Sequence, residues 1–290
     1  MTDTLRRSDF RCIHRLRVRW AEVDMQKIVF NGHYLTYIDT AMAEYWRVLA
    51  MPYESGMARL DGDVYLKKAT LEYHASARMD DWLDVGMRCA QVGNSSMRFV
   101  SGIFAGDRLL VSAELVYVFA NPATQTARPV PPALRGLFEA YEAGQGVTTV
   151  RTGDWNTLGR DALRLRMEVF VHEQGIPAEL EADEYDATAL HAIVLNQLGQ
   201  CVGTGRLTRQ EPGVGRIGRM AVDRMLRGSG VGRDLLLALV QAARARGDHT
   251  VILHAQVSAR RFYERLGFAA QGEVYEEAGL PHISMALSLA

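Results

Sequence analysis

The stretch RIGRMAVDRMLRGSGVGRDLLLALVQAARARG, residues 216–247, decides the fold of the second half of the chain. Residues 216–222 have the pattern of a strand, and residues 232–246 have that of an amphipathic helix that ends at Gly247. Between them, the glycine-rich segment 227–233 forms the entrance to the helix. Because glycines let backbone N–H groups approach phosphate oxygens, and because a helix N-terminus favours negative charge, this turn predicts a pyrophosphate site.

Outward from this turn, the second half alternates between helical and extended segments. Residues 160–170 and 258–266 are helical in pattern, whereas residues 192–196, 201–209 and 250–254 are extended. This alternation predicts an α/β unit built around a mixed sheet. A dinucleotide-binding Rossmann unit is disfavoured, because the turn does not lie near the start of a βαβ unit with a matching acidic residue downstream.

Three further segments accompany the Arg-x-x-Gly-x-Gly turn: LRMEVFVHEQ at 165–174, LHAQ at 253–256 and ARRFYERLGF at 259–268. Together they resemble the GNAT-type N-acetyltransferases, in their ElaA-like branch, over Trp155 to Met285. The resemblance implies that the turn holds the pyrophosphate of coenzyme A (CoA). It assigns this contact to Arg227, Gly228, Gly230 and Gly232, with further backbone N–H groups from Ser229, Val231 and Arg233.

The same resemblance implies which groups carry out acyl transfer. Met220 and Val222, on the preceding strand, would offer backbone groups to the acetyl carbonyl and to pantetheine. Tyr263 matches the tyrosine that protonates the departing CoA thiolate, and the alternative is that it is a core aromatic residue. The base for the acceptor amine stays open among residues that suit by type: Glu173, His254, Glu276 and His282.

An acidic cluster lies between these segments. Its members are Glu179, Glu181, Asp183, Glu184 and Asp186. Such a cluster is typical of a solvated loop, and the alternative is that it attracts a cationic acceptor.

The first half of the chain has a different pattern. Tyr34, Ile38, Ala41, Tyr45 and Leu49 recur at helical spacing, which predicts one long helix from Asn31, with Asn31 as its N-cap. Alternating runs follow that are typical of half-buried strands, at residues 66–74, 83–92, 96–105 and 109–119. One helix packed against an antiparallel sheet is the simplest arrangement.

The segment VRWAEVDMQKIVFNGHY at 18–34, together with EYHASARMDD at 72–81, resembles hotdog-fold acyl-CoA thioesterases of the 4-hydroxybenzoyl-CoA type. The resemblance implies that Asp24 is the general base or nucleophile, and that the backbone N–H of Asn31 polarises the thioester carbonyl with help from the helix dipole. It also implies a homo-oligomer through this domain, with sites formed between protomers. The sequence departs from the family pattern at Lys27, where glycine is usual, and at Asn31. Because lysine reaches positive φ less cheaply than glycine, we expect a differently shaped loop.

Length and composition agree with two globular domains. The chain has 290 residues, 33 basic and 34 acidic side chains, and a net charge of −1, so nucleic acid and anionic membranes are not expected partners. Three cysteines without CxxC spacing argue against disulfides and zinc, which favours the cytoplasm and predicts no metal. The proline- and glycine-rich region 121–146 predicts domains at 1–145 and 146–290.

We therefore expect an α+β protein with an N-terminal hotdog domain and a C-terminal GNAT-like α/β domain with a mixed sheet. The leading hypothesis is a fused enzyme that hydrolyses acyl-CoA and transfers acyl groups from acetyl-CoA or acyl-CoA to an unknown amine, with no tightly bound cofactor. In the alternative, one domain is catalytic and the other is an oligomerisation or CoA-binding module. A second half similar to acyl-homoserine-lactone synthases is less favoured, since the turn is of the CoA type.

Overall fold

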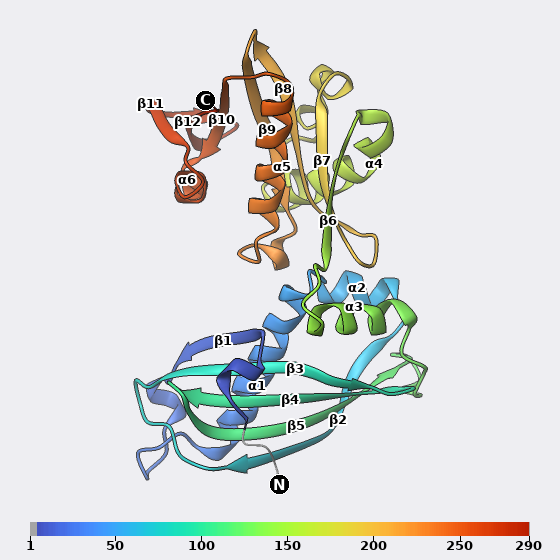
Figure 1. Ribbon diagram of the computed structural model, residues 1–290, viewed down its shortest axis with the longest axis vertical. Helices are drawn as coiled ribbons and strands as arrows, with labels where there is room; N and C mark the ends of the chain where they lie inside the picture. The colour runs from blue at the N-terminus through green and yellow to red at the C-terminus, as the bar shows by residue number, and fades with distance from the viewer. Residues whose placement is uncertain (1–4, 290) are drawn as a thin grey trace. The chain divides into compact units, whose positions relative to one another are not determined.

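The computed structural model describes residues 5–289, so the predicted domain ends at residues 1 and 290 lie outside the described residues. The chain divides into two compact units, Met1–Val147 and Thr148–Ala290 (Figure 1). Each unit contains its own sheet, and no strand is shared between the two sheets. Within residues 5–289, no helix is both long enough and apolar enough to cross a membrane.

The first unit is an antiparallel sheet with a long helix, as predicted. Its strands lie in the order β1-β3-β4-β5-β2. Their bounds are β1 Cys12–Arg17, β2 Asp63–Tyr73, β3 Trp82–Val92, β4 Ser96–Ala105 and β5 Arg108–Ala120. The prediction missed β1, which contains two arginines and one histidine and pairs with β3 at the sheet edge. Strand β2 forms the opposite edge, and most of its residues are exposed.

The long helix α1, Asn31–Val48, packs its apolar stripe against this sheet. Tyr34, Ile38, Ala41 and Tyr45 are all buried. The Tyr45 ring meets Phe99 of β4 edge-on, with 5.6 Å between the ring centroids. Two shorter helices complete the unit, α2 at Tyr53–Arg59 and α3 at Pro132–Glu142. The helical spacing therefore predicted the face that forms the core.

The second unit is a mixed sheet of order β11-β12-β10-β9-β8-β7-β6. The strand bounds are β6 Thr148–Gly153, β7 Leu190–Asn196, β8 Cys201–Glu211, β9 Val214–Val222, β10 Thr250–Gln256, β11 Ala269–Glu277 and β12 Leu280–Ser288. The helices are α4 Trp155–Arg166, α5 Val231–Ala245 and the short α6 Arg260–Glu264. The sequence did not predict β6, β11 or β12.

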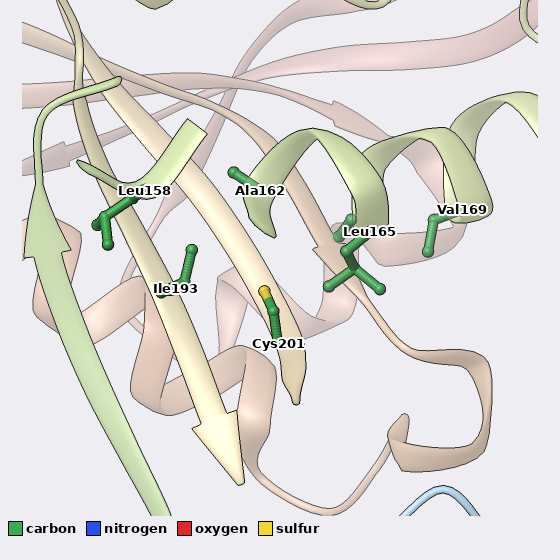
Figure 2. Packing of buried hydrophobic residues seen from close by; sticks show 7 residues of the cluster. Leu158, Ala162, Leu165, Val169, Ile193 and Cys201 are labelled. Atoms are coloured by element: carbon green, nitrogen blue, oxygen red, sulfur yellow. The ribbon is translucent and has the colours of Figure 1, made fainter. Parts of the chain in front are cut away.

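Helix α4 covers one face of this sheet through a small apolar cluster. Leu158, Ala162 and Leu165 of α4 pack against Ile193 of β7 and Cys201 of β8 (Figure 2). On the other face, α5 lies close to β8. A Cβ on Gly203 would meet Val231 of α5 at 2.8 Å, so glycine is needed for this close approach.

Strands β9 and β10 are parallel neighbours that separate along their length. They pair only over Thr250–Ile252 and Val214–Arg216; beyond that point β9 pairs with β8, and β10 pairs with β12. A β-bulge interrupts β9 where Thr204 faces Ala221 and Arg206 faces Gly218. Within this bulge, Arg219 has φ 52°. The separation opens the sheet, and the bulge turns the backbone of β9 at that opening.

Candidate functional site

A cavity of about 490 Å³ lies where β9 and β10 separate. Its lining comes from β9, β10, β11, β12, α6 and the segment that follows α4. The lining residues used below are Arg216, Arg219, Met220, His254, Tyr263, Glu277, Glu181 and His282. Openings of this kind at the carboxyl ends of parallel strands are common ligand sites in α/β proteins.

Tyr263 lines this cavity from helix α6. Its hydroxyl lies 3.9 Å from the sulfur of Met220, and its ring meets Phe262 and Phe268 edge-on. Burial raises the pKa of Tyr263 to about 12, so the phenol keeps its proton at neutral pH. The half-buried side chain thus packs against neighbouring aromatic rings and also lines the cavity, and its role as proton donor stays a prediction.

The backbone site residues of β9 separate into two groups. Met220 follows Arg219 in the bulge and lines the cavity. Val222 is not among the lining residues; it lies at the end of β9, where its carbonyl accepts a hydrogen bond from Arg227 Nε at 3.2 Å. Of the two, only Met220 therefore faces the cavity.

The glycine-rich turn brings backbone N–H groups together at the start of α5. Gly228 has φ 85° and Gly230 has φ 100°, which a residue with a Cβ rarely adopts. Within residues 5–289, no acceptor meets the N–H groups of Val231, Gly232 and Arg233, which belong to the first helical turn. By contrast, the N–H and the hydroxyl of Ser229 both bond the carbonyl of Leu226. The open donors suit an anionic group.

The guanidinium of Arg227 is bonded to a residue outside this turn. It forms two bonds of 2.6 Å with the carboxylate of Glu173, at the end of the π-helical turn Met167–Glu173. This hydrogen bond, together with the charge of Arg227, lowers the pKa of Glu173. Arg227 thus links the turn to the segment after α4, and Glu173 is its ion-pair partner. The pyrophosphate contact that the resemblance implies for Arg227 stays a prediction.

Among the base candidates, His254 and His282 line the cavity, whereas Glu276 does not and its neighbour Glu277 does. The Nδ1 atom of His254 is hydrogen-bonded to the hydroxyl of Tyr275. The Tyr275 ring stacks on His282, with 6.2 Å between centroids. Burial lowers the pKa of His254, and the positive charge of Arg216 lowers it further, so His254 is neutral at pH 7.

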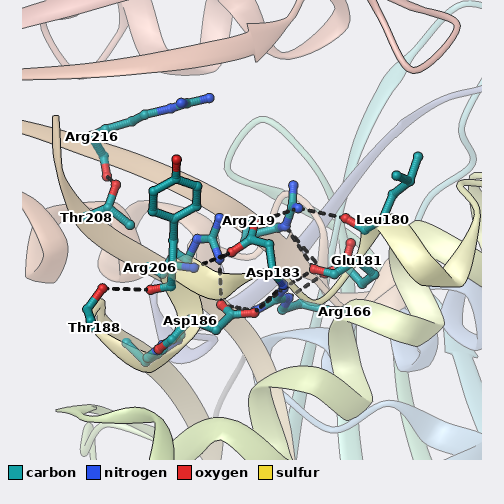
Figure 3. A network of polar contacts seen from close by, with 12 residues as sticks. Arg166, Leu180, Glu181, Asp183, Asp186, Thr188, Arg206, Thr208, Arg216 and Arg219 are labelled. Carbon is teal, nitrogen blue, oxygen red and sulfur yellow. Dashed lines mark hydrogen bonds and ion pairs between the residues drawn. The ribbon is translucent and has the colours of Figure 1, made fainter.

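Three members of the acidic cluster, Glu181, Asp183 and Asp186, form an ion network with arginines, whereas Glu179 and Glu184 are exposed (Figure 3). Glu181 and Asp186 are 1% and 3% exposed, and both bond Arg166 of α4, which is itself 1% exposed. Arg206 of β8 bonds Asp186 at 2.7 Å. Burial alone would raise the pKa of Asp186, but the hydrogen bonds from the two arginines outweigh it and lower that pKa. The solvated-loop interpretation was therefore wrong for Glu181 and Asp186, because their arginine partners lie on distant elements, and it holds for the exposed Glu179 and Glu184.

In the first unit, Asp24 lies in a loop closed by a bridge between Val23 and Val29. Its Oδ1 accepts a hydrogen bond from the N–H of Gln26 at 2.8 Å, and the side chain is half-buried. Lys27 has φ 60°, so lysine adopts the left-handed conformation that we expected to be unfavourable for it. Lysine thus adopts a conformation that glycine reaches at lower cost, and the expected difference in loop shape stays a prediction.

Asn31 is the first residue of α1 and is exposed. The N-cap is Phe30, so the prediction of Asn31 as the N-cap was one residue too late. In the described part of the chain, no acceptor meets the N–H of Asn31, and its carbonyl accepts a hydrogen bond from the hydroxyl of Tyr73 at 3.2 Å. Glu22, whose carbonyl accepts a hydrogen bond from the N–H of Phe30, is buried. Its carboxylate accepts a hydrogen bond from the hydroxyl of Tyr37 at 2.8 Å, which gives it a structural role.

Among the residues that were not predicted are Arg216 and Glu277, which line the cavity, and Tyr275, which is hydrogen-bonded to His254. The last two lie on β11, a strand whose sequence lacks clear alternation, and Arg216 differs in no sequence feature from other strand arginines. Across residues 5–289, no group of three or more His, Cys, Asp and Glu side chains could hold a metal ion.

Comparison with known families assigns both units. The acetyltransferase (GNAT) domain family matches residues 145–289, and the thioesterase superfamily matches residues 26–112. The first match includes Tyr263 and the glycine-rich turn, whereas the second includes Asn31 and begins two residues after Asp24.

Individual relatives match the second unit. The uncharacterized N-acetyltransferase YjcF of Bacillus subtilis is 39% identical over 127 residues, which is 43% of this chain and 89% of that protein. ElaA of Escherichia coli is 35% identical over 130 residues, covering 43% of this chain and 83% of ElaA.

Among solved structures, a thioesterase from Thermus thermophilus, complexed with coenzyme A and Zn, covers 47% of this chain and 96% of that chain. It is 23% identical, with a TM-score of 0.42. The chain belongs to the acetyltransferase (GNAT) domain family, and it carries a thioesterase-superfamily hotdog domain in its first unit.

Proposed function

We propose that the second unit transfers an acetyl or acyl group from acyl-CoA to an amine. Both families act on acyl-CoA substrates, and the open N–H groups of Val231, Gly232 and Arg233 suit the CoA pyrophosphate. The observation that carries the proposal is the protonated Tyr263 hydroxyl beside Met220, inside the cavity between β9 and β10.

The proposed reaction is direct attack of the amine nitrogen on the thioester carbonyl carbon. The C–N bond forms, the C–S bond breaks, and the departing thiolate takes the proton of the Tyr263 hydroxyl. His254, which is neutral and lines the same cavity, takes the proton that the amine loses. The backbone N–H of Met220 is our candidate donor to the carbonyl oxygen, where negative charge develops.

Replacing Tyr263 by phenylalanine tests this assignment, since the change removes the proton and keeps the ring. Amine-dependent thiol release from acetyl-CoA, measured over a panel of amines, should fall about 10²- to 10⁴-fold in kcat. Acetyl-CoA binding should stay unchanged. Tyr185→Phe is the matched control, because Tyr185 is exposed and lies outside the cavity. Equal rates in wild type and Tyr263→Phe would contradict the assignment.

We also propose that the first unit hydrolyses acyl-CoA. Asp24 would activate water or attack the thioester, while the open N–H of Asn31 at the start of α1 would stabilise the carbonyl oxygen as it becomes negative. The edge strand β2 presents Leu66 and Tyr73, which are 44% and 52% exposed, and these support a homo-oligomer through this unit.

Asp24→Asn tests the hydrolase, since the amide keeps the size of the side chain and removes the base. Thiol release without an amine should fall about 10²-fold or more. Asp107→Asn, in the exposed turn between β4 and β5, is the control and should keep full activity.

The competing view makes the first unit an oligomerisation or CoA-binding module with no activity of its own. It predicts that Asp24→Asn changes no measurable turnover while the oligomer persists.

A further inference from the structure

Most charged side chains around the cavity between β9 and β10 form ion pairs or hydrogen bonds within the protein. Glu181 is bonded to Arg166, and Arg219 donates to the carbonyl oxygens of Leu180 and Glu181 and to Asp183 at 3.1 Å. The acidic network is thereby neutralised by its own arginines and offers little attraction for a cationic acceptor. The charged lining residues that remain are Arg216 and Glu277.

Arg216 is a half-buried cation that lines the cavity without a counter-ion. Within residues 5–289, no hydrogen bond or ion pair holds its guanidinium. Figure 3 shows its side chain extending away from the ion network. A partly desolvated guanidinium without a partner is costly unless an anion meets it when the site is filled, and its planar fork fits a carboxylate.

The sheet register sets Arg216 beside the proposed base. Arg216 pairs with Ile252, and His254 follows two residues further along β10, so their side chains share one face of the sheet. The charges of Arg216 and Glu277 both act on the pKa of His254, in opposite directions. On the other side, His254 faces Ser284 of β12 and is hydrogen-bonded to Tyr275. His254 thus lines the same cavity as one cation, Arg216, and one anion, Glu277.

We propose that the acceptor is an amine that also carries a carboxylate, with the carboxylate bound by Arg216 and the amino group directed to Glu277 and His254. This proposal rests on the proposed acyltransferase function of the unit. It assigns Arg216 a role in substrate selection and leaves the transfer chemistry to Tyr263 and His254. A neutral or purely cationic amine would leave the guanidinium of Arg216 without its anion.

Matched pairs of probes test the proposal by binding, without requiring turnover. Glycine, β-alanine, 4-aminobutanoate and 6-aminohexanoate are titrated by calorimetry into the full chain saturated with CoA, each beside its carboxamide. We expect the best carboxylate probe to bind about tenfold or more tightly than its carboxamide, because a charge-assisted bond to the guanidinium is lost in the amide. Equal affinities in every pair, including no binding by any probe, would overturn the proposal.

Variants locate the effect. Arg216→Gln should abolish the preference for the carboxylate member of each pair, while Arg209→Gln, an exposed arginine on the neighbouring strand β8, should preserve it. Glu277→Gln should weaken both members of a pair equally and leave their ratio unchanged. A preference that survives Arg216→Gln would overturn the assignment.

The experiment distinguishes a failure of the acyltransferase proposal from a failure of the acceptor proposal. If the carboxylate preference holds while no probe consumes acetyl-CoA, the acceptor site stands and the proposed reaction is wrong.

Discussion

The two candidate sites differ in how much of each site a single chain supplies. In the second unit, one cavity gathers Tyr263, Met220 and His254. In the first unit, Asp24 is half-buried, and large apolar side chains nearby in the sequence are open to solvent, with Trp20 80%, Met25 100% and Phe30 53% exposed. The two cavities described in that unit are lined by other residues.

This difference teaches that sequence motifs of similar strength can mark sites of unequal completeness. Exposed apolar side chains gathered around a functional loop are typical of a surface that another molecule covers. For the first unit, a second copy of the chain fits the proposed homo-oligomer. In the second unit, by contrast, the strands and helices of a single chain line the cavity.

The largest expected effect is the loss of hydrolysis when the protein is diluted. If the first unit requires a second copy, hydrolysis per chain should disappear as the protein is diluted below the dissociation constant of the oligomer, whereas acyl transfer per chain should stay constant. Rates measured over a wide concentration range, beside the mass from light scattering, check this. Hydrolysis that stays proportional to protein concentration after the oligomer has dissociated would remove the contrast.

A second prediction concerns the ion network behind the cavity. Arg166→Met leaves Glu181 and Asp186 buried without their main partner and should cost the second unit about 3–5 kcal/mol. Native-state hydrogen exchange of β7 and β8 measures this loss for that unit alone. Arg164→Met, an exposed position on the same helix, should have little effect. A similar loss of stability in both variants would mean that the ion network does not stabilise the second unit.

Acid should lower the stability of the second unit. The pKa of Asp186 is raised by burial but lowered more by its bonds to Arg166 and Arg206, and that of Asp183 is lowered likewise. Stability from a lowered pKa is fully present above the unfolded value, about 4, and is lost as pH falls toward the folded value. Unfolding of the second unit, followed by hydrogen exchange from pH 5 to pH 3, should therefore become easier. Unchanged protection over that range would refute this.

The smallest expected effect lies in the Asp24 loop. Lys27→Gly should stabilise the first unit by about 1 kcal/mol, because glycine adopts φ 60° without the Cβ penalty. Lys27→Ala keeps the Cβ and should bring no such gain. Protection of α1 against hydrogen exchange compares the two variants, and equal stabilisation by both would point to the lysine charge instead.

Local pattern was sufficient to predict most of this fold. Helical spacing placed α1 and alternation placed β3 to β5, because each buries one face of its own segment, and alternation of residue types also placed the mostly exposed β2. The edge strands β1, β6 and β11 escaped prediction because their sequences do not alternate clearly between apolar and polar residues, unlike the edge strand β2. The glycine-rich turn was predicted from its residues because positive φ and open N–H groups are local properties.

Contacts between distant segments could not be predicted in the same way. The pairing of Arg227 with Glu173, and of Arg166 with Asp186, joins residues that only the folded sheet brings together. Arg216 and Glu277 reach one cavity because β9 and β10 separate, which depends on their register rather than on either sequence. A pattern within one segment carries no information on such partners.

The most direct test of the account is a crossed comparison on one panel of acyl-CoAs, with thiol release measured with and without an amine acceptor. Asp24→Asn should lose the amine-independent release and keep the amine-dependent part, whereas Tyr263→Phe should do the reverse. Loss of both activities in either variant, or no release from any acyl-CoA, would contradict two separate acyl-CoA sites in this chain.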